Sequence, residues 1–347
     1  MRLAYLALGL SLSLSLSLFA QIALAQEIDV EAQRSYPGTS ERVVRVISTA
    51  DLNIFEPFLQ QFQRSNPEIG IDYTVTSSTE LHRAITQNHA FDLAISSAMD
   101  LQFKLANDGF AQTYRSSVTE ELPVWASWRD LIFAFTSEPA VVVTYRADFD
   151  GLVPPATRQD LIALLRENTD QFEGRVGTYD VRDSGLGYLF ATQEARSSDA
   201  YWRLTEVMGR LDPQLYCCSA QMIDDVASGR LAMAYNVLGS YAAQRIEEDD
   251  RLAILELEDF ANVMLRTALI PSAAENIQDA GALLDALLRE GMRDVHDSWV
   301  LPPLSDAGAP EPAAFGPIRL GPGLMVNLDQ LNRRAFLDAW ESAMEQD

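Results

Sequence analysis

The chain has 347 residues, of which 48% are hydrophobic and 22% are charged, and this composition excludes disordered and collagen-like classes. Its 50 acidic residues outnumber its 26 basic residues and give a net charge of -24, which opposes binding to nucleic acid or to anionic membranes. The two cysteines are adjacent, so a long-range disulfide and a four-cysteine zinc site are also excluded.

The first 25 residues have the pattern of a cleaved signal peptide. Arg2 precedes a long run of leucine, serine and alanine, and Ala23 and Ala25 form a small-x-small cleavage site. The alternative is a transmembrane anchor, but the Ala-x-Ala ending and the acidic stretch after it favour cleavage. No later stretch reaches the roughly 18 continuous apolar residues that span a membrane. We therefore expect an exported, periplasmic protein that is not embedded in the membrane, with a flexible leader over residues 26–40.

Beyond the leader, short apolar stretches alternate with amphipathic helices. Strands are predicted over residues 43–47, 71–75 and 92–95. Residues 55–62 place four apolar side chains on one face of a helix after the first of these strands. This alternation is typical of βαβ units, which bury a parallel sheet.

Each of these strands ends in a turn that is rich in hydroxyl groups. In a parallel sheet, the ligand crevice lies outside the carboxyl ends of the strands. The turns also present the free N–H groups of the helices that follow, and these suit an anion or a polyhydroxyl ligand. Ordinary N-capping of the helices is the alternative interpretation. The candidate ligand-binding residues in these turns are Ser48, Thr49, Ser77, Ser78, Thr79 and Ser96.

A second series of strands and helices follows residues 141–145. Stretches over 175–179, 215–216 and 231–235 each lead into a turn and a helix. Arg182 stands beside one of these turns, either as a forked contact to an anion or as a surface partner of a neighbouring aspartate. Two such α/β units leave a cleft between them, a common site for small ligands. The candidate ligand-binding residues of this second unit are Arg182, Ser184, Gly185, Ser219, Asn236, Ser240 and Tyr241.

The chain lacks the sequence motifs of common enzyme classes. It has no Gly-x-Ser-x-Gly, no Gly-x-x-x-x-Gly-Lys-Ser/Thr and no complete Gly-x-Gly-x-x-Gly motif. Its three histidines, His82, His89 and His296, have no cysteine or carboxylate at a spacing that would complete a zinc site. We therefore expect no catalytic activity, no cofactor and no bound metal.

Cys217 and Cys218 follow a strand-like stretch and are expected on the cleft side of the second unit. Adjacent Cα atoms are about 3.8 Å apart, closer than the about 4.4–6.8 Å of a relaxed disulfide. An oxidising periplasm nevertheless favours disulfide formation. Three interpretations stay open, namely a vicinal disulfide, two buried thiols and a redox role.

Several stretches of the chain resemble one family of exported proteins. They are residues 135–143, 174–180, 184–188, 234–241 and 269–271. In order and spacing they are similar to periplasmic substrate-binding proteins of ABC transporters, in the group that includes iron(III)-, phosphonate- and phosphoglycerate-type members. The resemblance implies an α/β fold of type II with two lobes, each a mostly parallel sheet flanked by helices. The first lobe would comprise residues 41–138 and 264–347, and the second residues 139–263.

The resemblance also implies where a solute binds. In similar proteins the Ser-Gly start of a helix in the second lobe holds an anion, which corresponds to Ser184, Gly185 and Leu186 here. Glu138 lies in one of the matching stretches and joins the candidate site. Iron-binding members carry two consecutive tyrosines, whereas this chain has Ser240 and Tyr241. Because iron(III) prefers several anionic oxygen ligands, the resemblance favours an organic phosphate, phosphonate or carboxylate.

The expected function is therefore solute binding without catalysis. A monomer would capture a small anionic solute between its lobes and deliver it to an inner-membrane ABC permease or to a sensor kinase. Two alternatives stay open: an iron(III)-binding protein of the same family, with Tyr241 as a metal ligand, and an exported enzyme on the same fold.

Overall fold

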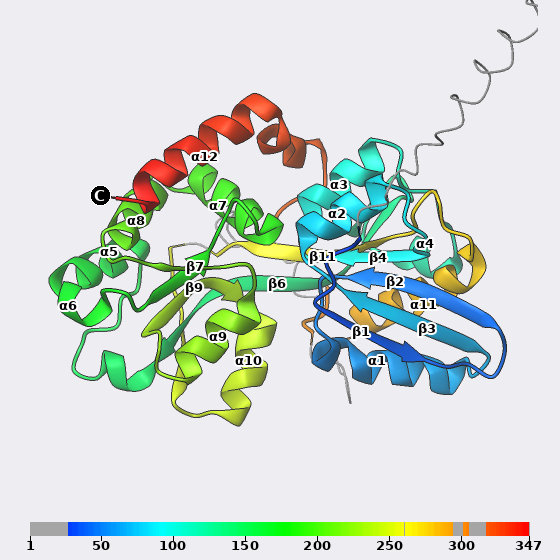
Figure 1. The fold of residues 1–347 in the computed structure, drawn as a ribbon, viewed down its shortest axis with the longest axis horizontal. Helices are drawn as coiled ribbons and strands as arrows, with labels where there is room; N and C mark the ends of the chain where they lie inside the picture. The colour runs from blue at the N-terminus through cyan, green and yellow to red at the C-terminus, as the bar shows by residue number, and fades with distance from the viewer. Residues whose placement is uncertain (1–26, 260, 294–300, 305–316, 347) are drawn as a thin grey trace, which may run out of the picture.

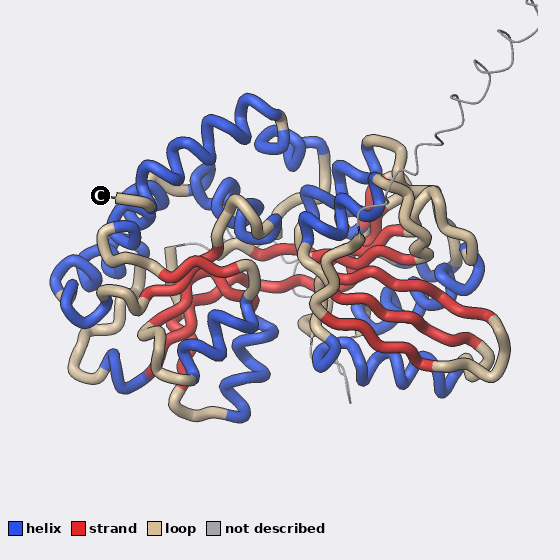
Figure 2. Tube along the Cα trace, viewed as in Figure 1, coloured by secondary structure: helices blue, strands red, loops and turns tan. Residues whose placement is uncertain are grey.

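A computed structural model describes residues 27–259, 261–293, 301–304 and 317–346 as a molecule of two lobes (Figure 1). Eleven strands in this part of the chain join in one continuous sheet, and helices lie on both sides of it (Figure 2). The predicted signal peptide lies outside the described residues. Within them, no helix combines the length and the apolar character that a membrane span requires.

The first lobe has a core of three parallel strands, β2, β3 and β4, with the antiparallel strand β1 at its edge. Six of the seven residues of β3 are buried, as expected for a strand with helices on both faces. The apolar face predicted for residues 55–62 packs into the core. The elements of this lobe are β1 (Ala32–Tyr36), β2 (Arg42–Ser48), α1 (Leu52–Ser65), β3 (Ile69–Val75), α2 (Ser78–Thr86), β4 (Leu93–Ser96), α3 (Met99–Asn107), α4 (Ser117–Glu121), β5 (Ser127–Trp128) and α11 (Ile277–Gly291).

The second lobe repeats this plan with parallel strands β7, β8 and β9. Its core is a separate cluster that includes Leu161, Phe172, Val176 and Tyr235. The elements of this lobe are α5 (Arg158–Glu167), α6 (Thr169–Phe172), β7 (Val176–Tyr179), α7 (Gly185–Ser197), α8 (Ala200–Gly209), β8 (Gln214–Tyr216), α9 (Ser219–Ala227), β9 (Met233–Leu238), α10 (Gly239–Glu248) and β10 (Leu252–Leu255).

Two antiparallel strands, β6 (Ile132–Tyr145) and β11 (Val263–Leu269), connect the lobes. The first half of β6 pairs with β11, and its second half pairs with β9 and β10. One strand therefore runs through both lobes, as Figure 1 shows. The sheet is parallel only in the core of each lobe, because β11 runs back along β6 and places antiparallel neighbours at the junction.

Two details of the predicted division differ from the structure. The stretch expected to be a flexible leader contains β1, which pairs with β3 from residue 32 to residue 36. The last helix, α12 (Gln330–Met344), was assigned to the first lobe but packs on α8 of the second, where Trp340 and Met344 are buried. The 3-10 helix η4 (Pro322–Leu328) contacts α3 in the first lobe. The C-terminal segment thus crosses from one lobe to the other.

Candidate functional site

The carboxyl ends of the parallel strands meet at a cleft between the lobes. Strands β2, β3 and β4 end on one side of it, and β7, β8 and β9 end on the other. The cavity has a volume of about 60 Å³. Most of its lining residues carry a hydroxyl group. They are Thr49, Thr76, Ser77, Ser78, Ser97, Tyr179, Ser184, Ser219 and Tyr241.

On the first-lobe wall, the turns after β2 and β4 hold each other in place. The Thr49 Oγ1 accepts a hydrogen bond from the Ser97 backbone N–H at 3.1 Å, and the two hydroxyl oxygens are 3.3 Å apart. Ser77 caps α2, because its Oγ accepts a hydrogen bond from the Glu80 N–H at 3.2 Å. The first turn of α2 therefore begins at the cleft, with N–H groups that lack partners inside the helix.

On the second-lobe wall, α7 and α9 also begin at the cleft. Ser184 caps α7 by accepting a hydrogen bond from the Gly187 N–H at 3.1 Å. Ser219 opens α9, and its Oγ lies 2.5 Å from the Tyr179 hydroxyl and accepts a hydrogen bond from the Leu238 N–H at 3.0 Å. These bonds fix the floor of the cleft and leave the first N–H groups of both helices facing it.

The two walls touch at the start of α7. The Thr79 hydroxyl donates a hydrogen bond to the Asp183 carbonyl at 3.2 Å. Gly185 lies so close to the first lobe that a Cβ atom there would be 2.6 Å from the Ser78 Oγ and 2.8 Å from a methyl carbon of Leu101. A side chain at this position would hold the lobes apart.

Two carboxylates line the cleft, and its described lining contains no lysine, arginine or histidine. Asp51 is half-buried, and its backbone N–H donates a hydrogen bond to the Tyr241 hydroxyl at 3.1 Å. Desolvation raises the pKa of Asp51, although a hydrogen bond from Tyr241 opposes the rise. Desolvation also raises the pKa of Glu31, and the negative charge of Asp51 adds to that rise. The cleft therefore holds two carboxylates that no basic side chain of its described lining neutralises.

The remaining lining is apolar. The two cysteines form a disulfide with each other, which excludes two free thiols and leaves a redox role open. This disulfide shares the cleft wall with Leu186, Ala220 and Leu238.

The family model of bacterial extracellular solute-binding proteins matches residues 48–293. The chain belongs to this family. Among solved structures, the substrate-binding protein of an ABC transporter from Agrobacterium tumefaciens is 31% identical, with a TM-score of 0.85 over 90% of this chain and 98% of that one. A comparison with curated proteins gives no match.

More distant solved structures share the two-lobed fold. AfuA from Actinobacillus pleuropneumoniae, with exogenous fructose-6-phosphate bound, is 15% identical. Its TM-score is 0.70 over 89% of this chain and 100% of that one. Iron-bound HitA from Pseudomonas aeruginosa is 13% identical, with a TM-score of 0.62 over 87% of this chain and 99% of that one.

The family and the type II fold are those expected from the sequence, and the chain is a solute-binding component of an ABC transporter. The family's extracellular character implies an exported protein. The family consists of binding proteins rather than enzymes. The different solutes named for these relatives show that the fold alone does not determine the solute.

The structure brings six of the predicted site residues into the lining of the cleft. They are Thr49, Ser77, Ser78, Ser184, Ser219 and Tyr241. Thr79 and Gly185 lie beside it, where the two lobes touch.

Ser48 and Ser96, also predicted in the site, are fully buried and shape the turns instead. The Ser48 Oγ accepts a hydrogen bond from the Ala50 N–H at 3.0 Å, and the Ser96 Oγ accepts one from the Ala98 N–H at 3.1 Å. Both hydroxyls are therefore used by the backbone, and neither lines the cleft.

Three other predicted residues belong to buried networks behind the cleft. Glu138 is fully buried and pairs with Arg266, with Nε to Oε1 at 2.8 Å and Nη2 to Oε2 at 3.1 Å. Ser240 donates a hydrogen bond to the same carboxylate. Asn236 donates its side-chain amide to Glu194 at 2.8 Å. None of these three side chains lines the cleft. Asn236 and Ser240 instead line a larger hollow beside β6 and β10.

The structure pairs Arg182 with carboxylates, which is the alternative that the sequence left open. Its Nε and Nη2 bind the two carboxylate oxygens of Asp180 at 2.8 and 2.7 Å, and its Nη1 binds Glu345 at 2.5 Å. The guanidinium also lies over the Trp340 ring, 5.5 Å from its centroid. Arg182 therefore attaches α12 to the second lobe and is absent from the described lining of the cleft.

Sequence reasoning missed five polar lining residues, namely Glu31, Asp51, Thr76, Ser97 and Tyr179. Asp51 and Ser97 belong to the turns already recognised after two strands, so the turn position alone was a usable signal. Glu31 precedes β1 in a stretch without apolar periodicity, and Tyr179 ends β7. No pattern in the sequence marks either side chain as facing the cleft.

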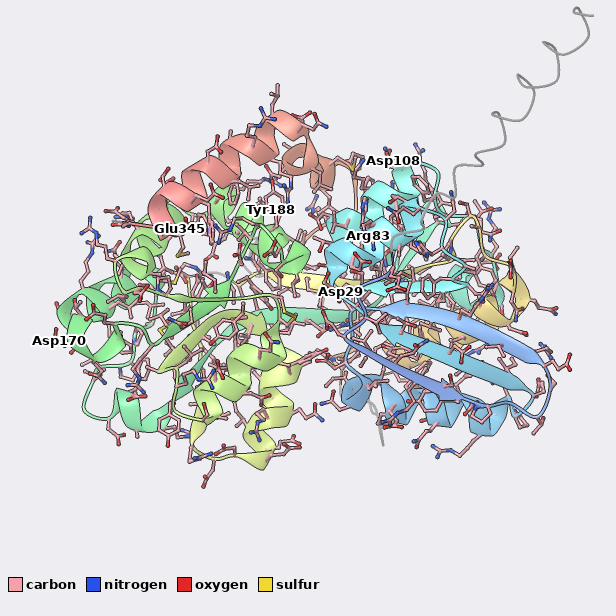
Figure 3. The ribbon with its side chains drawn as sticks, viewed as in Figure 1. Asp29, Arg83, Asp108, Asp170, Tyr188 and Glu345 are labelled. Atoms are coloured by element: carbon pink, nitrogen blue, oxygen red, sulfur yellow. A yellow bond between two sulfur atoms is a disulfide. The ribbon has the colours of Figure 1, made fainter. Side chains whose placement is uncertain are left out.

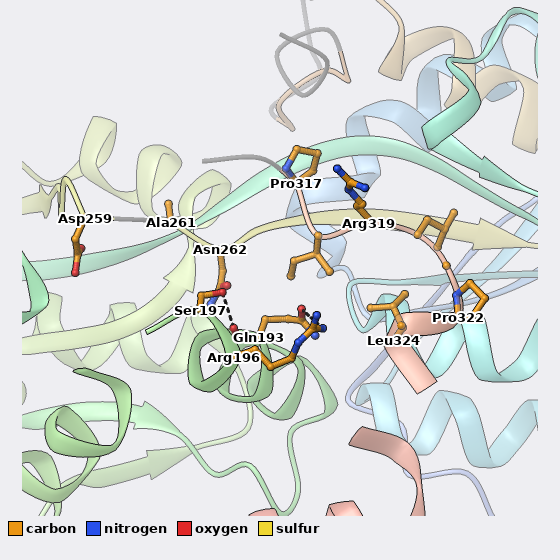
Figure 4. Close-up of a pocket in the computed structure, with 14 residues that line it drawn as sticks. Gln193, Arg196, Ser197, Asp259, Ala261, Asn262, Pro317, Arg319, Pro322 and Leu324 are labelled. Atoms are coloured by element: carbon orange, nitrogen blue, oxygen red, sulfur yellow. Dashed lines mark hydrogen bonds between the residues drawn. The ribbon is translucent and has the colours of Figure 1, made fainter. Parts of the chain in front are cut away.

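Two larger hollows lie outside the cleft. One, of about 730 Å³, separates α7 from residues 317–324, with Gln193 and Arg196 facing that segment (Figure 4). The other, of about 710 Å³, lies beside β6 and β10. Both adjoin segments outside the described residues, whereas the strand ends and helix starts converge on the cleft. Among the described residues, no group of three or more His, Cys, Asp or Glu side chains is placed to hold a metal ion.

Proposed function

We propose that this solute-binding protein captures a small zwitterion in the interlobe cleft and delivers it, as a monomer, to an inner-membrane ABC permease. The observation that carries the proposal is the pairing of two cleft carboxylates with three helix N-termini, in a lining without basic side chains. This revises the expectation of a purely anionic solute, for which Arg182 was one candidate contact beside the Ser-Gly helix start.

The positive end of the solute would lie beside Asp51 and Glu31. An ammonium group about 4 Å from a carboxylate gains about 4 kcal/mol at an effective dielectric constant of about 20. The same distance costs an anion about as much. The raised pKa values of both carboxyl groups show that each already lies in an environment that disfavours its charge, and a cation relieves this.

The negative end of the solute would lie against the first turns of α2, α7 and α9. A helix N-terminus carries about half a positive charge and free N–H groups that bind oxyanions. Ser77 and Ser184 cap two of these helices from within the cleft wall. Three such helix starts compensate an anionic group without an arginine.

The proposal can be tested with three probes that separate the two ends of such a solute: phosphoethanolamine, ethanolamine and inorganic phosphate. Titrations followed by tryptophan fluorescence at pH 8 should show phosphoethanolamine binding at least tenfold more tightly than either fragment, a difference of about 1.4 kcal/mol or more. Asp51→Asn should weaken phosphoethanolamine about tenfold and leave phosphate unchanged or tighter.

Asp170→Asn is the matched control, because Asp170 is an exposed aspartate on α6, at the far end of the second lobe (Figure 3). It should leave all three affinities unchanged. Tight binding of phosphate alone would restore the anionic solute. A coloured complex with iron(III) that Tyr241→Phe abolishes would restore the iron carrier. Steady conversion of a probe into product would show an enzyme.

A further inference from the structure

The Cys217–Cys218 disulfide occupies an exposed place in the cleft wall. Cys217 is exposed and Cys218 is half-buried. The pair follows β8 directly, and Cys218 is the N-cap residue of α9. The disulfide therefore lies in the turn between β8 and α9. The other turns that line the cleft also lie between a strand and a helix.

Global stability does not explain this bond. In the chain-entropy account, a disulfide stabilises a protein more when it closes a longer loop. These two cysteines are neighbours in sequence, so no residues lie in a loop between them whose freedom the bond could restrict. Neither sulfur belongs to the hydrophobic clusters of the described residues. We therefore look for the role of this disulfide in its position in the cleft wall.

The disulfide differs from the other caps at the cleft in its chemistry. Ser77 and Ser184 present oxygen atoms and bind N–H groups of their own helices. Cys218 makes no side-chain cap hydrogen bond. In a cleft lined mainly by hydroxyl groups and carboxylates, the two sulfurs and neighbouring Ala220 form an apolar surface beside the start of α9.

We propose that the Cys217–Cys218 disulfide is a contact surface for the solute, and that its reduction weakens solute binding. The eight-membered ring that the bond closes holds both sulfurs in one orientation, against the carbon atoms that link the charged ends of the solute. The inference rests on the proposed function, because it places the solute in the same cleft.

Reduction changes this surface by a balanced exchange with a dithiol. A thiolate of the dithiol attacks one protein sulfur, and the other leaves as a thiolate and takes up a proton. The second thiol of the reagent then attacks the mixed disulfide. The protein gains two electrons and two protons as Cys217 and Cys218 become thiols, and the dithiol becomes a cyclic disulfide. The two side chains then rotate independently and no longer form one surface.

The probe for the test is the small-molecule fraction of a bacterial cell extract, freed of macromolecules by ultrafiltration. Three forms of the full chain are compared by native mass spectrometry: the oxidised wild type, the wild type reduced with dithiothreitol, and the double variant Cys217→Ser/Cys218→Ser. The rate at which dithiothreitol reduces the wild type is also measured with and without the extract fraction. The double variant with and without dithiothreitol controls for effects of the reagent.

We expect a mass adduct on the oxidised protein, at least tenfold less of it on the reduced protein and the double variant, and slower reduction when the extract fraction is present. Equal unfolding midpoints of the three forms would show that the loss is local. Equal adduct on all three forms, with an unchanged reduction rate, would overturn this inference and leave the proposed function intact. An oxidised protein without any adduct would overturn solute capture, and this inference with it.

Discussion

Replacement of Arg266 by methionine tests the buried ion pair between the two strands that cross from lobe to lobe. Arg266 on β11 and Glu138 on β6 are both fully buried. Hydrogen bonds from Thr136 and Ser240 complete the surroundings of the carboxylate. The substitution Arg266→Met keeps most of the side-chain volume and removes the charge together with the two hydrogen bonds to Glu138.

The expected loss is large because the charge left behind cannot reach water. Two unit charges about 3 Å apart attract each other by about 5–6 kcal/mol at an effective dielectric constant of about 20. Removing one partner of a buried pair typically costs about 3–5 kcal/mol. We therefore expect Arg266→Met to lower the free energy of unfolding by about 3–5 kcal/mol at pH 8. The double variant Glu138→Gln/Arg266→Met should recover most of this loss, because no buried charge remains.

The pH dependence gives a second test of the same pair. Burial raises the pKa of Glu138, but Arg266 and the hydrogen bonds outweigh burial and leave that pKa below its ordinary value. In the wild type, this carboxylate stabilises the fold above its unfolded pKa of about 4.3, and the contribution is lost as the pH falls through the lower folded value. Without Arg266, burial raises the folded pKa above the unfolded one, so the penalty grows as the pH rises.

Urea unfolding followed by circular dichroism at pH 5 and pH 8 measures both effects. The loss caused by Arg266→Met should be larger at pH 8 than at pH 5. A loss below about 1 kcal/mol at pH 8, within the range of an exposed ion pair, would refute the reasoning. So would a loss of the same size at both pH values.

Two further substitutions separate lobe closure from stability. Gly185→Ala should lower capture of the extract adduct at least tenfold, because the added Cβ meets Ser78 across the cleft. The free energy of unfolding, measured with urea, should change by less than about 1 kcal/mol. Unchanged capture would contradict this. Arg182→Ala should lower the free energy of unfolding by about 1 kcal/mol, because it breaks the partly exposed pairs with Asp180 and Glu345. Solute affinity should not change, and a weaker affinity at unchanged stability would restore Arg182 as an anion contact.

The layers and half of the site were predictable because they depend on local patterns. Apolar periodicity predicted the helix face over residues 55–62 and the strands before the hydroxyl-rich turns. Parallel strands bring their carboxyl ends to one edge, so Thr49 and Ser77 were expected together at the edge of the first lobe, and Ser184 at the corresponding edge of the second. No distant contact is needed for that inference.

The errors concern charged residues whose partners are distant in sequence. Arg182 stands beside the cap of α7, and its neighbour Asp180 was the recognised alternative partner. Glu345, which completes the pairing, lies 163 residues further along the chain. Figure 3 shows it near the end of α12, the helix that the sequence division placed in the other lobe. The lobe assignment was wrong and the pairing of Arg182 with Glu345 was missed for the same reason, because the packing of α12 was not visible in the sequence.

The error at Ser48 and Ser96 shows how the turns distribute their hydroxyl groups. In both turns the last serine of the strand accepts a hydrogen bond from the N–H two residues later. This closes the turn and aims the next side chain, Thr49 or Ser97, into the cleft. The first hydroxyl thus closes its own turn and is buried, whereas the second lines the cleft, where Thr49 also accepts a hydrogen bond from the Ser97 N–H. A buried backbone N–H needs a hydrogen-bond partner whether or not a ligand is bound. Where a strand ends with consecutive hydroxyl residues at the edge of a cleft, the second of them is therefore the better candidate for a contact to the solute.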